Sequence, residues 1–262
     1  GFLDFRFVSN LTIRNVEMHH AWHSLQLRSC INTLVEGCYI HDIDEPGPHT
    51  PGDPTNLRYG IWVANASQNV VISNCRFRQT RHAVTFGTNS GTNGNGIQRN
   101  VVVANCVSQE ADTAHYDAHQ PVDGITFIGC SAIGGMVYLA ESGQAVVGYQ
   151  SRGRNVSFIG CLALAIPGRG FMAQGAEADN TRFIGCSAVD IQERLGGGEG
   201  VGFYIDSGGS NRHIINGCIV LGSDSAGLNA TGSAHDCVVT NNVFENTGRV
   251  VTTAAVKFTN AL

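Results

Sequence analysis

The chain has 262 residues, a formal net charge of −5 at pH 7, 14% charged residues and 33 glycines. That length can bury a substantial core, and many glycines with few charges favour a turn-rich fold over a helical bundle or a disordered tail. The acidic balance excludes the basic surface of a protein that binds nucleic acid or an anionic membrane, and no apolar run reaches the about 18 residues that span a bilayer.

The chain begins GFLDFRFVSN, with neither an initiator methionine nor a signal segment. We therefore expect a single domain over residues 1–262 that is a fragment of a longer chain.

One repeat then runs through the whole sequence, with a period of about 28 residues. Its clearest copies read FIGC, at 127–130, 158–161 and 183–186. In chain order the nine copies are centred on Val16, Cys38, Cys75, Cys106, Cys130, Cys161, Cys186, Cys218 and Asn242. A bulky apolar residue lies three places before each centre. The residue just before each centre is Asn or Gly, which tolerate the left-handed backbone of a sharp bend.

Each copy is preceded, by about a dozen residues, by a second short alternating segment. These segments are SLQLR, GIWVAN, AVTFG, YDAH, GYQSRG, GFMAQG, GFYIDS and GLNATG. Short strands at a fixed long period, with no helical pattern between them, predict coils stacked on one another. We expect an all-β fold, a right-handed parallel β-helix of about nine coils; a β-sandwich with a chance repeat is the alternative. The cysteines that share one repeat position predict a buried column of mostly free thiols.

The repeat, together with SQNVVISNCRFRQTRHAVTFG at 67–87, resembles the pectate-lyase-like single-stranded right-handed β-helix superfamily, and in particular its phage tailspikes and polysaccharide depolymerases. The resemblance covers nearly all of the chain. It implies a polysaccharide as partner, a homotrimer, and a location in a virion tail or outside the cell.

Alternation in the second type of strand points one set of side chains outward. In chain order these are Gln26/Arg28, Trp62/Ala64, Thr85/Gly87, Asp117/His119, Gln150/Arg152, Met172/Gln174, Tyr204/Asp206 and Asn229/Thr231. Stacked coils place them side by side at about 4.8 Å, which predicts a flat polar ridge with aromatic residues that suits a sugar chain. The predicted substrate contacts are Gln150, Tyr204, Asp206, Gln174, Trp62, Thr85 and, at the edge of the ridge, His82.

The centre of this ridge carries the predicted catalytic groups. His119 is the candidate base or acid, with Asp117 as its orienting partner, while Arg152 and Gln150 would hold a uronate carboxylate. The triplet DAH followed by YQSR also resembles the D-P-H triplet and downstream Arg of mannuronan C5-epimerases, which implies catalytic roles for the same Asp, His and Arg. That family's catalytic Tyr is replaced by Ala114 here. The alternative is a solvated ladder of salt bridges with no catalytic role.

A glycosidase with two carboxylates is a further alternative, and it needs them about 5–9.5 Å apart. Asp117 and Asp206 lie three coils apart, about 14 Å. A loop acid would have to complete the pair, and the candidates are Glu110, Asp112, Asp123 and Glu141.

Three other segments carry weaker signals. The turn-rich stretch at 41–60 contains Asp42, Asp44, Glu45 and Asp53 and could bind Ca²⁺, but it lacks a defined ligand spacing and reads better as a solvated loop. HHAWH at 19–23 lacks the Cys or carboxylate partners of a zinc site. QERLGGGEG at 192–200 reads as a loop beside the ridge that offers Glu193 and Arg194 to a substrate. We expect no metal and no cofactor.

The sequence thus predicts a protein that binds and cleaves an acidic polysaccharide, with β-elimination favoured. A glycoside hydrolase, a uronan C5-epimerase and a non-catalytic glycan-binding adhesin or structural fibre remain as alternatives.

Overall fold

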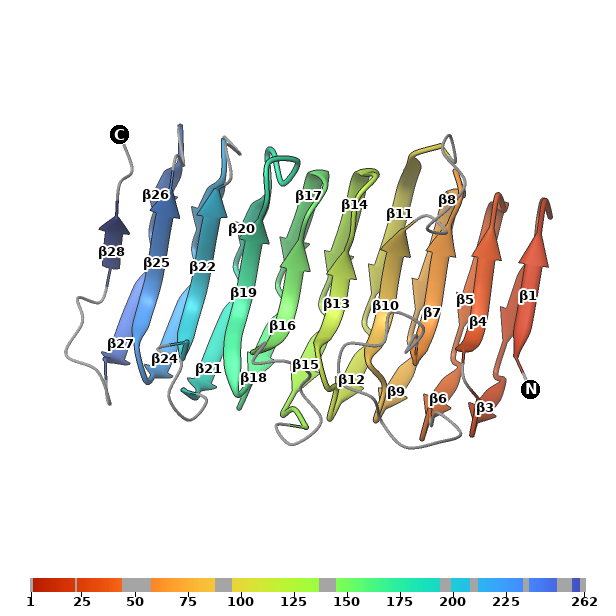
Figure 1. Cartoon of the computed structure of the whole chain (residues 1–262), viewed down its shortest axis with the longest axis horizontal. Coiled ribbons are helices and arrows are strands. Elements are labelled where there is room, and N and C mark those ends of the chain that lie inside the picture. Colours follow the sequence, from red (N-terminus) through yellow and green to blue (C-terminus); the bar gives the residue numbers. More distant parts are fainter. Residues whose placement is uncertain are drawn as a thin grey trace.

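The computed structural model shows a right-handed parallel β-helix of about nine coils, as predicted (Figure 1). It describes residues 2–21, 23–43, 58–87, 96–136, 145–193, 199–207, 212–232, 236–248 and 256–259. Each coil contributes one strand to each of three parallel sheets, and strands follow one another along every sheet in chain order.

The three sheets are named A, B and C. Sheet A consists of β1 (Leu3–Arg6), β4 (His23–Arg28), β7 (Tyr59–Ala64), β10 (His82–Gly87), β13 (Ala114–Ala118), β16 (Val146–Ser151), β19 (Gly168–Gln174), β22 (Val201–Ser207), β25 (Ala226–Gly232) and β28 (Val256–Thr259). Sheet B consists of β2 (Thr12–Arg14), β5 (Ile31–Glu36), β8 (Gln68–Ser73), β11 (Gln98–Ala104), β14 (Val122–Ile128), β17 (Arg154–Ile159), β20 (Arg182–Ile184), β23 (Ile214–Asn216) and β26 (Val238–Thr240). Sheet C consists of β3 (Glu17–His19), β6 (Tyr39–His41), β9 (Arg76–Arg78), β12 (Val107–Gln109), β15 (Ser131–Ile133), β18 (Leu162–Leu164), β21 (Ser187–Ile191), β24 (Ile219–Ser223) and β27 (Val243–Thr247).

The corner between sheets B and C is the bend that the repeat predicts. Every Asn or Gly that precedes a repeat centre is left-handed, with φ between 53° and 64°. These residues are Asn15, Gly37, Asn74, Asn105, Gly129, Gly160, Gly185, Gly217 and Asn241. A left-handed backbone costs other L-residues about 1–2 kcal/mol, which explains the restriction to these two residue types.

The sequence also carries a second left-handed position that we did not predict. It lies three residues before the bulky apolar residue of each copy, and Asn occupies it in most copies. Its side chains bond to one another along the helix axis: Asn32 Nδ2 donates to Asn10 Oδ1 over 3.2 Å, and Asn69 Nδ2 donates to Asn32 Oδ1 over 3.1 Å. This ladder satisfies the amides of a corner that faces solvent.

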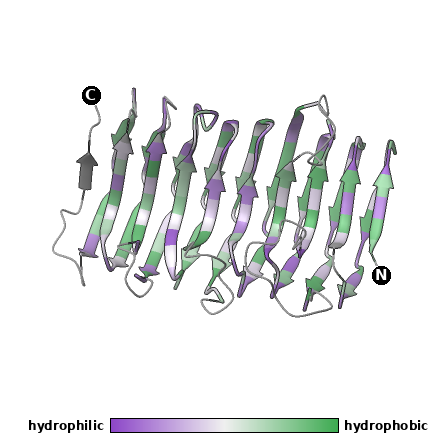
Figure 2. Ribbon diagram, viewed as in Figure 1, coloured by the Kyte–Doolittle hydropathy of each residue, from purple (hydrophilic) through white to green (hydrophobic). Residues whose placement is uncertain are grey.

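The core consists of identical positions stacked coil upon coil, because the strands pair in register. Phe127, Phe158 and Phe183 form one aromatic stack, with centroids 5.0 and 5.3 Å apart. Tyr116 and Tyr149 begin a second stack that continues into Phe171 and Phe203. All nine cysteines are free, and all but Cys237 are buried, as expected. Along each strand, hydrophobic and hydrophilic residues succeed one another in short bands (Figure 2).

Across the described residues, no helix is long and apolar enough to cross a membrane. The same part of the chain brings no three His, Cys, Asp or Glu side chains into a metal-binding group. Of the residues proposed to bind Ca²⁺, Asp42 lies against His41, and Asp44, Glu45 and Asp53 lie outside the described residues. Glu141 and Arg194 lie outside them as well.

Candidate functional site

Sheet A aligns the predicted outward row as the sequence indicated. Thr85 pairs with Asp117, Asp117 with Gln150, and Gln150 with Met172 on successive strands. Tyr204 follows Met172 in the same row. Two distant dipeptide patterns, Asp117/His119 and Gln150/Arg152, therefore lie on adjacent coils, β13 and β16.

The prediction of an open, flat ridge is wrong for much of this row. Trp62 is 6% exposed and Thr85 is 3% exposed, so neither side chain presents a surface to a sugar. The Trp62 ring lies 6.0 Å from Tyr59 and beneath the guanidinium of Arg28, 5.4 Å away. Strand alternation defines the side of the sheet on which a residue lies, but it says nothing about the neighbours that cover it.

Asp117 and Arg152 form an ion pair at the centre of the row. Arg152 Nε donates to Asp117 Oδ1 over 3.3 Å, and its Nη2 donates to Oδ2. Asp117 is buried, whereas the Arg152 side chain is 30% exposed. Burial alone would raise the pKa of Asp117, but the positive charge of Arg152, with smaller contributions from His82 and His119, holds this pKa below its ordinary value. Asp117 is therefore a carboxylate whose main partner is Arg152.

His82 lies under the same carboxylate, with its Nε2 4.0 Å from Asp117 Oδ2. Its Nδ1–H donates to the Ala114 carbonyl over 2.9 Å, which fixes the tautomer. Burial lowers the pKa of His82 to about 3, so the ring is neutral near pH 7. The neutral ring lines the site, and its Nε2 carries a lone pair.

His119 follows directly after β13 and is partly exposed, on the coil next to Arg152. Its Nδ1 lies 3.0 Å from the Gln120 carbonyl and must donate to it. The other nitrogen, Nε2, then carries the lone pair in the neutral ring. This is the protonation pattern that a general base requires.

A cavity of about 420 Å³ is lined by Arg152 but not by Asp117, and we name it the Arg152 cavity. Its lining consists of Arg81, His82, Thr113, Ala145, Val147, Gln150, Arg152, Arg169, Met172, Gln174 and Glu199. This lining contains three arginines, Arg81, Arg152 and Arg169, and one carboxylate, that of Glu199. Of the predicted substrate contacts, His82, Gln150 and Gln174 lie here, and Gln150 Nε2 donates to Gln174 Oε1 over 3.1 Å.

Sequence reasoning missed one side of this cavity. The Arg169 guanidinium lies 3.9 Å from the centroid of the Tyr204 ring and 3.3 Å from Glu199. Tyr204 therefore supports the site through Arg169, while Asp206 is absent from the lining. Arg169 directly precedes the alternating segment GFMAQ, and its register partner Val147 is also in the lining, which is the signal that could have found it.

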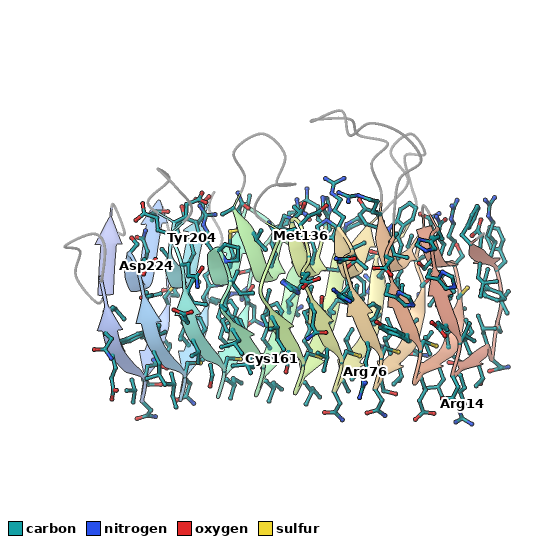
Figure 3. The ribbon with its side chains drawn as sticks, turned by 90° about the horizontal axis from the view of Figure 1, so that it is seen from below. Arg14, Arg76, Met136, Cys161, Tyr204 and Asp224 are labelled. Atoms are coloured by element: carbon teal, nitrogen blue, oxygen red, sulfur yellow. The ribbon has the colours of Figure 1, made fainter. Side chains whose placement is uncertain are left out.

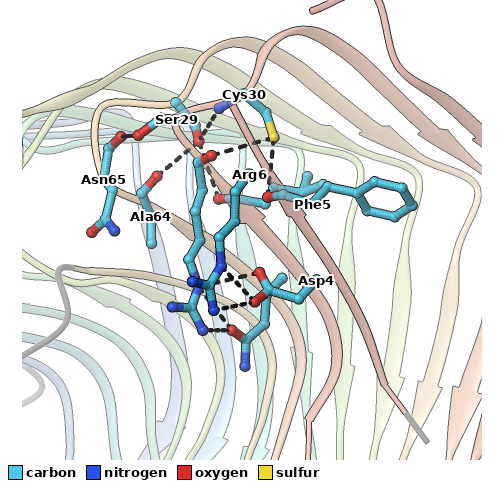
Figure 4. A network of polar contacts seen from close by, with 11 residues as sticks. Asp4, Phe5, Arg6, Ser29, Cys30, Ala64 and Asn65 are labelled. Carbon is cyan, nitrogen blue, oxygen red and sulfur yellow. Dashed lines mark hydrogen bonds and ion pairs between the residues drawn. The ribbon is translucent and has the colours of Figure 1, made fainter. Parts of the chain in front are cut away.

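The N-terminal end of sheet A holds another arginine network (Figure 4). Arg6 Nε donates to Asp4 Oδ2 over 2.8 Å, Arg28 Nε lies 3.3 Å from Asp4 Oδ1, and Arg28 also bonds to Gln26. Asp4 occupies the same outward row as Asp117, but it does not line the Arg152 cavity.

Known proteins similar to this chain include a phage depolymerase, a bacterial adhesin and a phage tailspike. A capsule K1-specific depolymerase of Klebsiella phage K64-1 is 27% identical over 163 residues, which are 58% of this chain and 16% of the depolymerase. The Streptococcus pneumoniae surface adhesin PfbA superimposes with a TM-score of 0.72 at 13% identity, over 97% of this chain and 62% of the adhesin. A tailspike protein of the E. coli bacteriophage HK620, solved with a pentasaccharide, gives 0.57 at 14% identity, over 96% of this chain and 47% of the tailspike.

The two structures are less than 25% identical to this chain and support the fold alone. The family described as Gp49, pectin lyase-like, matches residues 29–171, which include the strands from β5 to β18 and the Asp117–Arg152 pair. The match covers more than half of the sequence, so the chain belongs to the Gp49 pectin lyase-like family.

Proposed function

We propose that this chain binds and degrades an acidic polysaccharide in the Arg152 cavity. The observation that carries the proposal is a concave site whose lining holds three arginines and one carboxylate, Glu199, with Asp117 buried against Arg152, in a chain whose overall charge is negative. Concave sites with a few convergent charged groups are the usual places for ligand binding. The similarity to a capsule depolymerase of a phage supports a polysaccharide substrate.

Arg152 holds the substrate carboxylate in this proposal, and Gln150, which is only 6% exposed and donates to Gln174, lies beside it in the cavity lining. Asp117 occupies Nε and Nη2 of Arg152, and a guanidinium has five N–H donors, so the N–H groups beyond this pair remain for a ligand. The positive charge of Arg152 beside the substrate carboxylate stabilises the negative charge that develops when the neighbouring C5 proton leaves.

His119, which is partly exposed on the coil next to Arg152 but outside the cavity lining, is the proposed base. Its Nε2 takes the C5 proton, the electron pair of the C5–H bond forms the C4–C5 double bond, and the bond from C4 to the glycosidic oxygen breaks. The leaving oxygen then takes this proton from the imidazolium, directly or relayed through a water molecule, which restores the neutral ring. Asp117 holds Arg152 in position and carries no proton in this scheme.

Hydrolysis by two carboxylates has less support. Asp117 is buried and bound to Arg152, and Asp206 lies three strands away on β22, about 14 Å by strand spacing. The loop acids are engaged elsewhere: Glu110 with Arg78, Asp112 with Arg58, and Asp123 with Asn155. Glu199, in the lining, is bound to Arg169.

The decisive experiment offers capsular polysaccharides and uronans to the wild-type chain and to His119→Ala. The wild type should release unsaturated oligosaccharides, seen by ultraviolet absorbance and mass spectrometry. His119→Ala should lose at least about 10²-fold in rate, the lower end of the usual contribution of a general base, with unchanged circular dichroism.

The other outcomes identify the alternatives. New reducing ends without unsaturation would indicate hydrolysis, and altered uronate configuration at constant chain length would indicate epimerisation. Binding without either change would indicate an adhesin. Full activity of His119→Ala would contradict the assignment of the base.

We further propose that the parent protein sits in a virion tail as a homotrimer, by analogy with phage depolymerases and tailspikes. Sedimentation velocity of this chain checks the oligomeric state, and a species at the mass of one 27.8 kDa chain would contradict trimer formation by this region alone.

A further inference from the structure

A second cavity, of about 650 Å³, lies at the corner between sheets B and C. Its lining consists of Gly37, Cys38, Tyr39, Asn74, Arg76, Phe77, Val107 and Gln109. It crosses β6, β9 and β12, and we name it the Tyr39–Arg76 groove. Figure 3 shows Arg76 on the side of the molecule away from Tyr204, so the groove and the Arg152 cavity occupy different faces.

Arg76 is an exposed cation that takes part in no ion pair among the described residues. Two other exposed arginines have carboxylate partners: Arg14 binds Glu36 at 2.9 Å, and Arg78 binds Glu110 at 3.1 Å. No residue in the described part of the chain forms a hydrogen bond or an ion pair with the Arg76 side chain. An unpaired guanidinium in a concavity is a site for a carboxylate or another anion.

Tyr39 provides a fixed aromatic surface beside this cation. It is the register neighbour of Arg76 on the adjacent strand and is 38% exposed. One face of its ring stacks on His41, with centroids 4.2 Å apart. His41 is itself held by Asp42 at 2.8 Å and by Glu17 at 3.0 Å, so the aromatic surface has a rigid support.

The amides of Asn74 and Gln109 complete the lining, and both residues are exposed. Asn74 lies at a left-handed corner, and Gly37 occupies the same corner on the preceding coil. An aromatic ring, two amides and one cation form the combination that recognises an acidic sugar, through stacking, hydroxyl contacts and carboxylate binding.

We propose that the Tyr39–Arg76 groove is a second glycan-binding site, which holds about two residues of an acidic polysaccharide without cleaving it. Three adjacent strands span about 10 Å, the length of about two sugar rings. The uronate carboxylate binds Arg76, a ring lies against Tyr39, and hydroxyls bind the two amides. The described lining contains no carboxylate or histidine that could act as acid or base. The inference rests on the proposed function in that both sites take the same class of glycan.

The test measures binding of uronate oligomers by calorimetry in the Arg152→Gln background, in which the cavity has lost its carboxylate ligand. Hexamers of galacturonate, mannuronate and glucuronate-containing glycan serve as probes. Arg76→Gln should weaken binding of at least one probe about tenfold, the usual effect of losing one charge-assisted hydrogen bond. Tyr39→Ala should do the same. Arg14→Gln removes the same charge outside the groove and should leave the affinity unchanged.

Equal losses in Arg76→Gln and Arg14→Gln would reduce the effect to overall charge and overturn the proposal. Affinities that Arg76→Gln and Tyr39→Ala leave unchanged for all three probes would overturn it as well. The two proposals are tested independently. Cleavage of polysaccharide by the wild type tests the Arg152 cavity, whereas the binding assay tests the Tyr39–Arg76 groove whether or not cleavage occurs.

Discussion

Asp117 shows how one residue can be both central to a site and inaccessible to a ligand. It is 1% exposed and acts on a substrate only through the position and charge of Arg152. The sequence placed these two residues together through their strand patterns, and the strand register confirms that placement. It could not show that the carboxylate lies beneath the guanidinium, because alternation carries no information about depth.

Asp117→Asn tests this positioning role. The amide keeps the shape but removes the charge that anchors Arg152, so kcat/KM should fall at least about tenfold, with a rise in KM as the carboxylate clamp loosens. Asp4→Asn is the matched control, since Asp4 lies in the same row and also binds two arginines (Figure 4). Steady-state kinetics on both variants, with melting temperatures as a check of folding, provide the measurement. Equal kinetic losses in the two variants would contradict a specific role for Asp117.

At the scale of the elements, the corner between sheets B and C is where sequence determines backbone most directly. Gly160 has a φ of 58°, and a Cβ built there meets nothing within 4 Å. Substitution at this position therefore isolates the cost of the left-handed backbone from the cost of a steric clash. At Gly129, by contrast, a Cβ would lie 2.8 Å from Asn105 Oδ1, so both costs apply.

We expect Gly160→Ala to lower the free energy of unfolding by about 1–2 kcal/mol, and Gly160→Asn to lower it less, because Asn adopts this conformation more readily. Gly129→Ala should cost more than Gly160→Ala. Urea denaturation of the three variants measures these differences. If Ala and Asn at position 160 proved equally destabilising, the explanation by backbone conformation would be wrong.

The corners of the coils differ in how far the repeat predicts their backbone conformation. The Asn and Gly residues between sheets B and C were recognisable because all nine copies share two residue types. The Asn ladder through Asn10, Asn32 and Asn69 has an equally fixed spacing and could have been predicted. The corner after sheet C could not, because residues as different as His20, Gln79 and Ala165 share its left-handed conformation. There the backbone is imposed by the neighbouring coils and not by local preference.

At the scale of the whole molecule, a tightly packed solenoid buries titratable side chains that the unfolded chain would expose. His115 is fully buried: its Nε2–H donates to the Gly134 carbonyl and its Nδ1 accepts from the Ser108 hydroxyl, both at 2.8 Å. Burial lowers the pKa of His115 to about 4 and that of His82 to about 3. Neither burial could be predicted from the sequence, since a histidine at the edge of a strand pattern occurs equally well on a surface.

These two pKa values predict how stability changes with pH. Below pH 6.5, about the ordinary pKa of histidine, these two histidines bind protons in the unfolded chain but not in the folded chain. The free energy of unfolding therefore falls as pH decreases. Each histidine contributes up to about 1.4 kcal/mol per pH unit, until the pH reaches its folded pKa. The stabilisation by His115 is therefore complete above about pH 6.5 and is lost between about pH 6.5 and pH 4.

Urea denaturation across this range should show the decline, and His115→Gln should make it shallower. His20→Gln, at an exposed histidine, serves as the control. Titration of the wild-type imidazoles by NMR gives an independent reading, and a protonated His115 in the folded chain at pH 6 would contradict the argument.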